Sequence, residues 1–396
     1  MLQFQRYNTI TDVPTKYWNR LVTRDMVNLE IDHLQAIEIS RVNHLHPYYL
    51  IGYWNGEPIG ITYCFVLQAN FAKIASDYSI DSKVLKTIGG STHDFMDIRV
   101  LEVGHIASLG PTVSIQSTHQ INFLTALSEE LNAIATIEQS DLCLIRDIDL
   151  AHYKVFASLK NNGYYPIMGF PIARIAIHWN CFEEYMRALT AKRRNNIRQK
   201  RTKLQVPEIS VEVIKDYGIY AEKLSKLWEN VAKRSNSYEH EHLTPAFFRA
   251  MSTFLKDRSH VVAIKKSGEI IAYGLNLIGD KEYFGMAIGM DYRFRDQYDL
   301  YANNIFESFG VACRLHKKIF NIGITTYDFK TSIGGELEPA FYFIKTFNNP
   351  QLSILYADII QRHIEQPENN HHVFRQQDIS DRIQLKDIKN RVYAKV

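Results

Sequence analysis

Two stretches of this chain share one pattern, and that pattern predicts the fold. Residues 48–66 read YYLIGYWNGEPIGITYCFV, and residues 260–278 read HVVAIKKSGEIIAYGLNLI. Each is an apolar run, a two-residue turn signal (Asn-Gly in the first, Ser-Gly in the second) and another apolar run. This arrangement is typical of a β-hairpin. The paired hairpins indicate that the chain contains two copies of one α+β unit.

The elements that follow each hairpin keep the same order: strand, helix, strand, strand. After the first hairpin we expect a strand over 99–110, a helix over 118–138 and strands at 141–148 and 170–179. After the second we expect a strand over 281–292, a helix over 300–316 and strands at 319–324 and 340–348. The helices are assigned from apolar residues at helical spacing. The sequence therefore predicts a domain over 1–180, a second over 181–365 and a polar tail over 366–396.

Composition narrows the class of protein. The 396 residues are 46% hydrophobic and 22% charged, with a formal net charge of +3. These values are ordinary for a globular chain and argue against a dedicated nucleic-acid coat protein. The four cysteines lie far apart in apolar contexts, which favours buried thiols in a reducing compartment. No run approaches 18 apolar residues. We therefore expect a cytoplasmic protein without a membrane span.

The most unusual segment is strongly basic. Residues 187–203 read RALTAKRRNNIRQKRTK and contain eight Lys or Arg and no acid. On a helix, Arg193 falls within an apolar stripe, whereas Arg194 and Arg198 face the polar side. Two interpretations stay open at this point. The segment is either a solvated basic helix or an anion site for the phosphates of a cofactor, a carrier or tRNA.

A second segment raises a question about a single lysine. Residues 327–349 read YDFKTSIGGELEPAFYFIKTFNN, a turn or short helix followed by a Gly-Gly break and an apolar strand. Lys330 precedes Gly334 and Gly335, where the backbone can approach a ligand because side chains are absent. We predict that Lys330 points into a cleft of the second domain. The alternative is an exposed lysine at a helix end.

These two segments resemble the FemAB-like aminoacyl and acyl transferases, which carry two GNAT-type (N-acetyltransferase-like) domains. A Lys-x-Arg-x-Asn-Ile-Arg pattern marks the start of the second domain in that family, and residues 192–198 meet it. A Tyr-x-Phe-Lys segment followed by Gly precedes the last core strands, as at 327–334. The resemblance implies an N-acyltransferase that joins an activated acyl donor to a small amine acceptor. It implies no permanently bound cofactor. The segment SYEHEHLTP (237–245) contains Glu239, His240, Glu241 and His242 but no clear further ligand motif, so we expect no metal site.

The donor stays open between three classes: acyl-CoA, an acyl-carrier thioester and aminoacyl-tRNA. GNAT enzymes hold the CoA pyrophosphate on a Gly-rich turn after the central strand. Here that turn reads MDYRFRDQYDLYANN (290–304) and has no glycine, which argues against acetyl-CoA bound in the usual way. The family's tRNA-dependent members carry a long coiled-coil arm, and no such heptad hairpin is present. A carrier protein or tRNA is therefore an alternative partner to CoA.

The resemblance and the local patterns together nominate site residues. The expected catalytic residues are Lys330, which would stabilise the oxyanion or bind the donor's phosphate, and Asp291, which would orient or deprotonate the amine. The expected donor-binding residues are Lys192, Arg194, Arg198, Gly334 and Gly335, and the expected acceptor cleft contains Tyr292, Tyr298, Tyr301 and Tyr327. The competing hypothesis is a non-catalytic protein of the same fold whose basic helix holds RNA or another polyanion.

Overall fold

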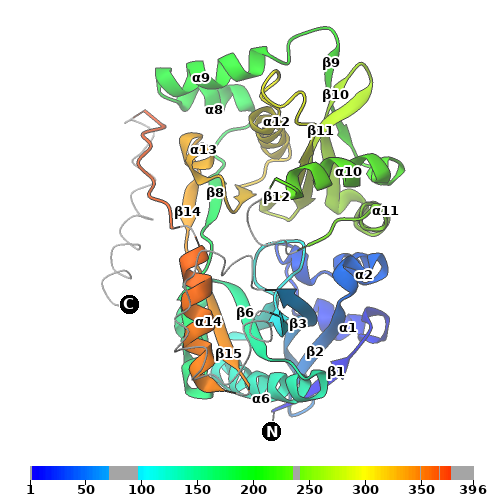
Figure 1. Ribbon diagram of the computed structural model, residues 1–396, viewed down its shortest axis with the longest axis vertical. Coiled ribbons are helices and arrows are strands. Elements are labelled where there is room, and N and C mark those ends of the chain that lie inside the picture. The colour runs from blue at the N-terminus through cyan, green and yellow to red at the C-terminus, as the bar shows by residue number, and fades with distance from the viewer. Residues whose placement is uncertain (1, 71–96, 235–240, 348, 365, 376–396) are drawn as a thin grey trace.

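The structure, a computed structural model, describes residues 2–70, 97–234, 241–347, 349–364 and 366–375. Glu239 and His240 lie outside these residues, as does the predicted tail beyond residue 375. Two mixed sheets, each with helices on both faces, are stacked along the long axis of the molecule (Figure 1). The predicted α+β class with two tandem GNAT-like units is confirmed.

The first sheet lies in the half that contains the N-terminus. In spatial order its strands are β1 (Leu2–Tyr7), β2 (His46–Trp54), β3 (Glu57–Asn70), β4 (Asp97–Val103), β6 (Leu142–Asp149), β15 (Ala340–Thr346) and β7 (Tyr165–Met168), with β5 (Val113–Ile115) paired to β3. Its only parallel pair among the described strands is β4 with β6. Its helices are α1 (Thr15–Asn19), α2 (Ile31–Ser40), α6 (Gln120–Glu138), α7 (Leu150–Phe156) and α14 (Pro350–His363).

The second sheet repeats this plan. Its strands in spatial order are β14 (Glu336–Glu338), β8 (Ile172–Ala176), β13 (Ile319–Gly323), β12 (Glu282–Met290), β11 (Glu269–Ile278), β10 (Ser259–Lys266) and β9 (Ile209–Ile214). Its helices are α8 (Phe182–Ala188), α9 (Ala191–Thr202), α10 (Ala221–Ala232), α11 (Pro245–Leu255), α12 (Leu300–Arg314) and α13 (Tyr327–Ser332). The parallel pair β12–β13 is joined over only three residues of each strand, and the two strands then diverge.

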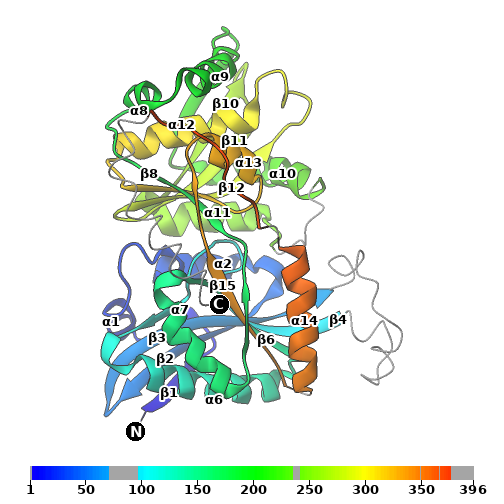
Figure 2. The ribbon, with the colours of Figure 1, turned by 90° about the vertical axis from the view of Figure 1, so that its left-hand side faces the viewer.

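The two sheets exchange strands. β8 precedes residue 180 but pairs with β13 and β14 of the second sheet, and β15 returns from the second half to lie between β6 and β7. Figure 2 shows β15 running from the second half down into the first. The domain boundary near residue 180 stays a prediction. The sequence does not predict that the two sheets exchange strands. Each sheet is therefore completed by a strand from the other half of the chain.

Local sequence explains most element boundaries. Both hairpins turn on two residues with positive φ, at 50° and 86° in the first and 49° and 86° in the second, as type I′ turns require. α11 begins at Pro245 because the Thr244 hydroxyl accepts a hydrogen bond from the Phe247 amide. One strand prediction was too long: β4 ends at Val103 rather than near residue 110. The chain leaves the sheet there as a loop, whose fixation is described below.

Two apolar faces decide where the first sheet is open. α6 and α7 cover one face through a core that includes Phe123, Leu127 and Phe156. On the other face, α1 and α2 pack against β2 and β3, and α14 packs beside β15 and β7. Figure 2 shows α2 and α14 on opposite sides of this face. None of the helices in the described part of the chain is both long and apolar enough to cross a membrane.

Candidate functional site

A cavity of about 770 Å³ lies between the two halves. One wall comes from the first sheet, through residues of β3, β4 and β6, and the other from β11, β12, β13 and α12. The cavity therefore includes the space where β12 and β13 separate. Its volume is in the range that small-molecule sites occupy.

Lys330 contributes an amine to this cavity. It lies on α13, directly after β13, and its residue surface is only 3% exposed. Its Nζ donates a hydrogen bond of 2.5 Å to the carbonyl oxygen of Ile324. Burial disfavours the charged form, which lowers the pKa of Lys330 to about 7. At neutral pH the amine can therefore both accept and donate a proton.

The backbone that presents Lys330 is held in an unusual conformation. Gly323, Thr325 and Thr326 have φ values of 74°, 62° and 50°. β-Branched residues rarely adopt positive φ, because the side chain then crowds the backbone. A Cβ on Gly323 would lie 3.8 Å from Nζ of Lys330 and 3.8 Å from Leu109 of the first half. The strained turn thus brings the amine, the end of β13 and a loop of the first half together.

Buried amides surround the diverging strands. Asn276, Asn304 and Asn321 line the cavity and are each at most 3% exposed. The side-chain amide of Asn304 donates to the backbone carbonyl of Val262 at 2.8 Å. The side-chain oxygen (Oδ1) of Asn321 accepts a hydrogen bond from the backbone amide of Gly323 at 2.9 Å. These bonds hold the side chains in place, so the wall beside Lys330 is polar but uncharged.

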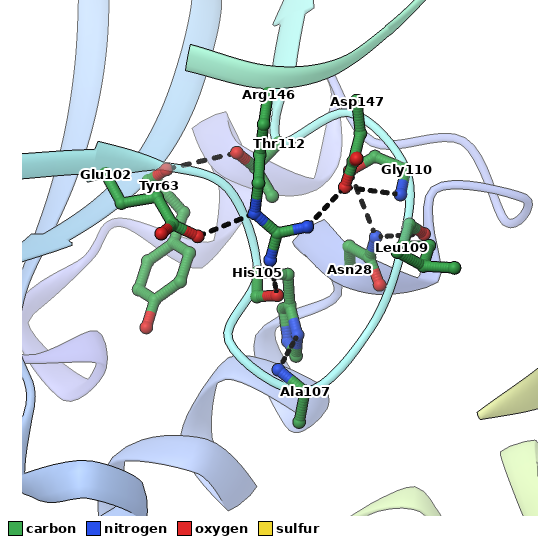
Figure 3. Close-up of polar contacts among 10 residues, drawn as sticks. All are labelled: Asn28, Tyr63, Glu102, His105, Ala107, Leu109, Gly110, Thr112, Arg146 and Asp147. Atoms are coloured by element: carbon green, nitrogen blue, oxygen red, sulfur yellow. Dashed lines mark hydrogen bonds and ion pairs between the residues drawn. The ribbon is translucent and has the colours of Figure 1, made fainter. Parts of the chain in front are cut away.

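The parallel strand pair of the first half, β4 and β6, is joined by an ion cluster that also lines the cavity. Arg146 of β6 reaches across to β4, where its Nε donates to Glu102 at 2.6 Å, and its Nη1 donates to Asp147 at 2.5 Å. Its Nη2 donates to the carbonyl of His105. Figure 3 shows the guanidinium between these three partners, with Asp147 also bonded to the amide of Gly110. The ion cluster fixes the loop that follows β4.

Only some of the predicted site residues meet at the cavity. Tyr292 and Tyr301 line it together with Lys330. Tyr298 is buried and donates to Glu208 at 3.3 Å, and the buried Tyr327 donates to the carbonyl of Pro171 at 2.8 Å. Neither of these two is among the lining residues.

Asp291 does not line the cavity either. Its carboxylate accepts hydrogen bonds from the guanidinium of Arg293 at 2.6–3.1 Å. These bonds hold the pKa of Asp291 below its ordinary value. The aspartate is therefore a partner of a neighbouring exposed arginine.

Gly334 and Gly335 pack closely against other residues of the protein. A Cβ on Gly334 would lie 2.5 Å from the ring of Phe374, and one on Gly335 would lie 2.7 Å from the Lys330 carbonyl oxygen. Phe374 belongs to residues 366–375, which pack along the second half. His371 in that segment contacts Asp328 at 2.8 Å and Arg193 at 2.7 Å. This segment joins α13 to α9.

The basic helix α9 lies away from the cavity lining. Arg193 is only half-buried and contacts His371, although its place in the apolar stripe predicts burial. Lys200 and Arg201, together with Lys203 just after the helix, pair with acids. Those pairs are Lys200 and Lys203 with Asp299, and Arg201 with Glu307. Lys192 and Arg198 are exposed, and Arg194 donates to the Leu189 carbonyl at 3.1 Å.

Sequence reasoning missed the ion cluster of the first half. The signal was present, because Glu102 and Arg146 are charged residues inside otherwise apolar strand segments. Charged residues in a buried strand are expected to pair with one another. The sequence does not show which strands are adjacent, and so it does not predict this pair.

Solved structures with the same fold span nearly the whole chain. The crystal structure of FemX covers 89% of this chain with 99% of its own, at a TM-score of 0.56 and 10% sequence identity. A tandem GNAT protein from the clavulanic acid biosynthesis pathway covers 87% with 98% of its own, at a TM-score of 0.51 and 8% identity. At these identities the likeness shows the fold.

A curated relative comes from Mycobacterium tuberculosis, a putative 8-amino-7-oxononanoate synthase 2 that is 29% identical over 354 residues. The match covers 86% of this chain and 45% of the relative, so the chain spans less than half of the relative's length. Residues 9–296 match the family described as peptidoglycan biosynthesis/recognition, a match that ends before Lys330. The chain thus belongs to the FemAB-like family, acyltransferases built on the GNAT fold.

Proposed function

We propose that this protein is an N-acyltransferase that forms an amide from an activated acyl donor and an amine acceptor in the cavity between the two halves. The observation that carries the proposal is Lys330, a buried amine of lowered pKa on the cavity wall. A lysine of this kind is common among catalytic bases because burial makes its neutral form available.

Lys330 begins the cycle as a neutral amine whose N–H bonds to Ile324. The acceptor nitrogen attacks the donor carbonyl carbon, which gives a tetrahedral intermediate with a negative oxygen and a positive nitrogen. Lys330 takes the proton from that nitrogen. The new ammonium then lies beside the negative oxygen and stabilises it electrostatically.

Collapse of the intermediate completes the reaction. The carbonyl forms again, the bond from carbon to the leaving sulfur or oxygen breaks, and Lys330 returns its proton to the leaving group. One thioester or ester and one amine thus become one amide and one thiol or alcohol. Lys330 ends the cycle neutral, and no oxidant or reductant is needed.

The donor enters where β12 and β13 diverge, since the cavity includes that gap and Tyr292 and Tyr301 border it. The donor is an acyl-CoA, an acyl-carrier thioester or an aminoacyl-tRNA. Because Lys192, Arg194 and Arg198 lie outside the cavity lining, we assign them to distal phosphates of the donor. The scheme does not use Asp291, Gly334 or Gly335.

The second candidate is a protein of the same fold that binds a polyanion through α9 without catalysis. The exposed Lys192 and Arg198 favour it. The open cavity beside Lys330 favours the enzyme, because a binding protein that used only α9 would have no need of a buried amine at another place.

The test supplies the protein with labelled acyl-CoA, acyl-carrier and aminoacyl-tRNA pools together with a mixture of amines. We expect one donor class to give a labelled amide, with kcat/KM rising with pH through about 7, because Lys330 acts in its neutral form. Lys330→Met should lower kcat/KM by about ten- to a hundred-fold, since it removes a charge-assisted bond of about 1.5–3 kcal/mol.

Lys154→Met, an exposed lysine of α7, is the matched control and should leave turnover unchanged. Turnover that survives in Lys330→Met would remove the lysine from the mechanism. Failure of all three donor classes, together with RNA binding that depends on Lys192 and Arg198, would instead support the non-catalytic candidate.

A further inference from the structure

The cavity has an apolar arm that the chemistry at Lys330 does not use. This arm runs along one face of the first sheet, and its wall is lined by Leu67, Val100, Leu142, Leu144, Ile360 and Ile364. These residues come from β3, β4 and β6, from α14 and, for Ile364, from the position directly after α14. We call this part of the cavity the α14 groove.

The geometry of β6 gives the groove a direction. Leu142, Leu144 and Arg146 alternate along the strand, so all three side chains point to the same face, and all three line the cavity. From Leu142 to Arg146 the strand rises roughly 13 Å. Arg146 marks the end toward the second half, where β6 leads into the ion cluster, and Leu142 marks the far end.

The groove exists because two sets of helices leave part of the sheet uncovered. α1 and α2 pack on β2 and β3, and α14 packs by β15 and β7, so β4 and the start of β6 lie between them. Leu144 and Ile360 are only partly buried there. Apolar side chains that border a cavity gain free energy when an apolar ligand removes them from water.

Charge limits what the groove accepts. Arg146 is already paired with Glu102 and Asp147, so this cluster carries one more negative charge than positive and offers no cation to a carboxylate. Among the described lining residues, no Lys, Arg, Asp or Glu lies beyond the cluster toward Leu142. A carboxylate at the end of a chain would lose its hydration there without a partner.

We propose that the α14 groove binds the acyl group of the donor, as an unbranched aliphatic chain with a methyl end toward Leu142 and its carbonyl at Lys330. This inference rests on the proposed function, because it assumes that the reacting carbonyl lies at Lys330. It specifies the acyl group as longer than acetyl and free of a terminal carboxylate.

Binding is tested apart from turnover. The full chain is titrated with decanoic acid, which displaces dansyl-undecanoic acid as the fluorescent reporter. We expect Leu144→Trp and Ile360→Trp, which fill the groove, to weaken decanoate binding at least tenfold. Ile354→Trp is the matched control, because Ile354 lies on the same helix but is 57% exposed, and it should bind as the wild type does.

Turnover is then measured with N-acetylcysteamine thioesters from acetyl to dodecanoyl and one fixed amine. The wild type should prefer medium chains and reject the chain of equal length that ends in a carboxylate. Leu144→Trp should shift the preference to shorter chains, whereas Lys330→Met should slow every length alike and still bind decanoate.

The outcomes separate the two proposals. No decanoate binding by the wild type, or equal binding by the wild type and both tryptophan variants, overturns the groove assignment. Turnover that ignores chain length also overturns it and leaves the acyltransferase proposal standing. Decanoate binding that depends on the groove, with no turnover of any donor, supports the groove and contradicts the proposed function.

Discussion

Each half contains one pair of parallel strands, and the two halves differ in how the buried cation beside that pair is compensated. In the first half, Arg146 of β6 is bonded to Glu102 of β4, to Asp147 and to a carbonyl. In the second half, the gap between β12 and β13 opens into the cavity, and Lys330 on its wall is bonded to one carbonyl. A fully paired charge fixes a loop, whereas an amine without a counter-ion is left available for proton transfer.

The difference follows from how each charge is compensated. The carboxylates beside Arg146 raise its pKa despite burial, so it is charged at every physiological pH. Among the described residues, no carboxylate offsets the burial of Lys330, and its pKa falls to about 7. The same topology can therefore carry a structural ion cluster in one copy and a titratable group in the other.

The largest effect is expected from breaking the ion cluster. Arg146→Met leaves Glu102 and Asp147 buried without their cation and should destabilise the protein by about 3–5 kcal/mol. Urea unfolding followed by circular dichroism measures this. Arg99→Met, which removes a half-exposed partner of Glu138, is the control and should cost only about 0–1 kcal/mol. Equal losses in the two variants would show that the cluster contributes no more than a surface pair.

Replacing Lys330 should instead stabilise the folded protein. Its folded pKa of about 7 lies below the unfolded value, so the unfolded state binds more protons and the stability of the wild type rises between pH 7 and about 10.5. At pH 7 this costs the fold about 4 kcal/mol. Lys330→Met removes that cost. It also leaves the Ile324 carbonyl without the hydrogen bond from Lys330, which destabilises the fold by about 1–3 kcal/mol.

Lys330→Met should therefore be more stable than the wild type by about 1–3 kcal/mol at pH 7, while it loses activity. Its advantage should shrink as the pH rises toward 10.5. Urea unfolding at pH 7 and pH 10 checks both points. A variant that is less stable than the wild type at pH 7 would mean that the lysine is a structural group.

Two glycines offer a smaller test of filled against open space. A Cβ on Gly104 would lie 2.7 Å from Nε of Arg146 and 2.8 Å from Oε1 of Glu102. Gly104→Ala should therefore displace the cluster and cost about 1–3 kcal/mol. A Cβ on Gly285, beside the open gap, would meet nothing nearer than 3.4 Å, so Gly285→Ala should cost well under about 1 kcal/mol. If thermal unfolding shows a larger loss of stability for Gly285→Ala than for Gly104→Ala, the residues around Arg146 are not closely packed.

The smallest effect on stability is expected on α9. Arg194→Ala combined with Arg198→Ala removes two charges outside the core, which contribute about 0–1 kcal/mol each, so unfolding should barely change. Binding of a phosphate-bearing donor should weaken, and more so at low salt. A variant that unfolds easily but binds its donor normally would assign these arginines to structure.

Sequence patterns predicted the repeated fold well because each hairpin is specified locally, by two residues with positive φ between apolar runs. The exchange of β8 and β15 could not be predicted, since both segments are apolar strands that fit either sheet. Helix α14 was missed for a related reason: its tertiary partners, β15 and β7, are not visible in the sequence.

The site was predictable only in part. The family segment and the Gly-Gly break point to Lys330, but its burial depends on tertiary contacts that the sequence does not show. Asp291 was chosen for its position after a strand, and the competing bond to Arg293 two residues later decided its environment. The sequence predicts that Gly334 and Gly335 leave space for a ligand, whereas Phe374 from a distant segment lies where a side chain on Gly334 would be.

The most direct test of the comparison is competitive labelling of the lysines with trace acetic anhydride between pH 5 and 11, quantified for each peptide by mass spectrometry. It needs no knowledge of the donor, and Lys330→Met identifies the relevant peptide. We predict that Lys330 reacts through the cavity with an apparent pKa of about 7. A Lys330 that is unreactive at every pH, or that reacts only near pH 10, would contradict the account.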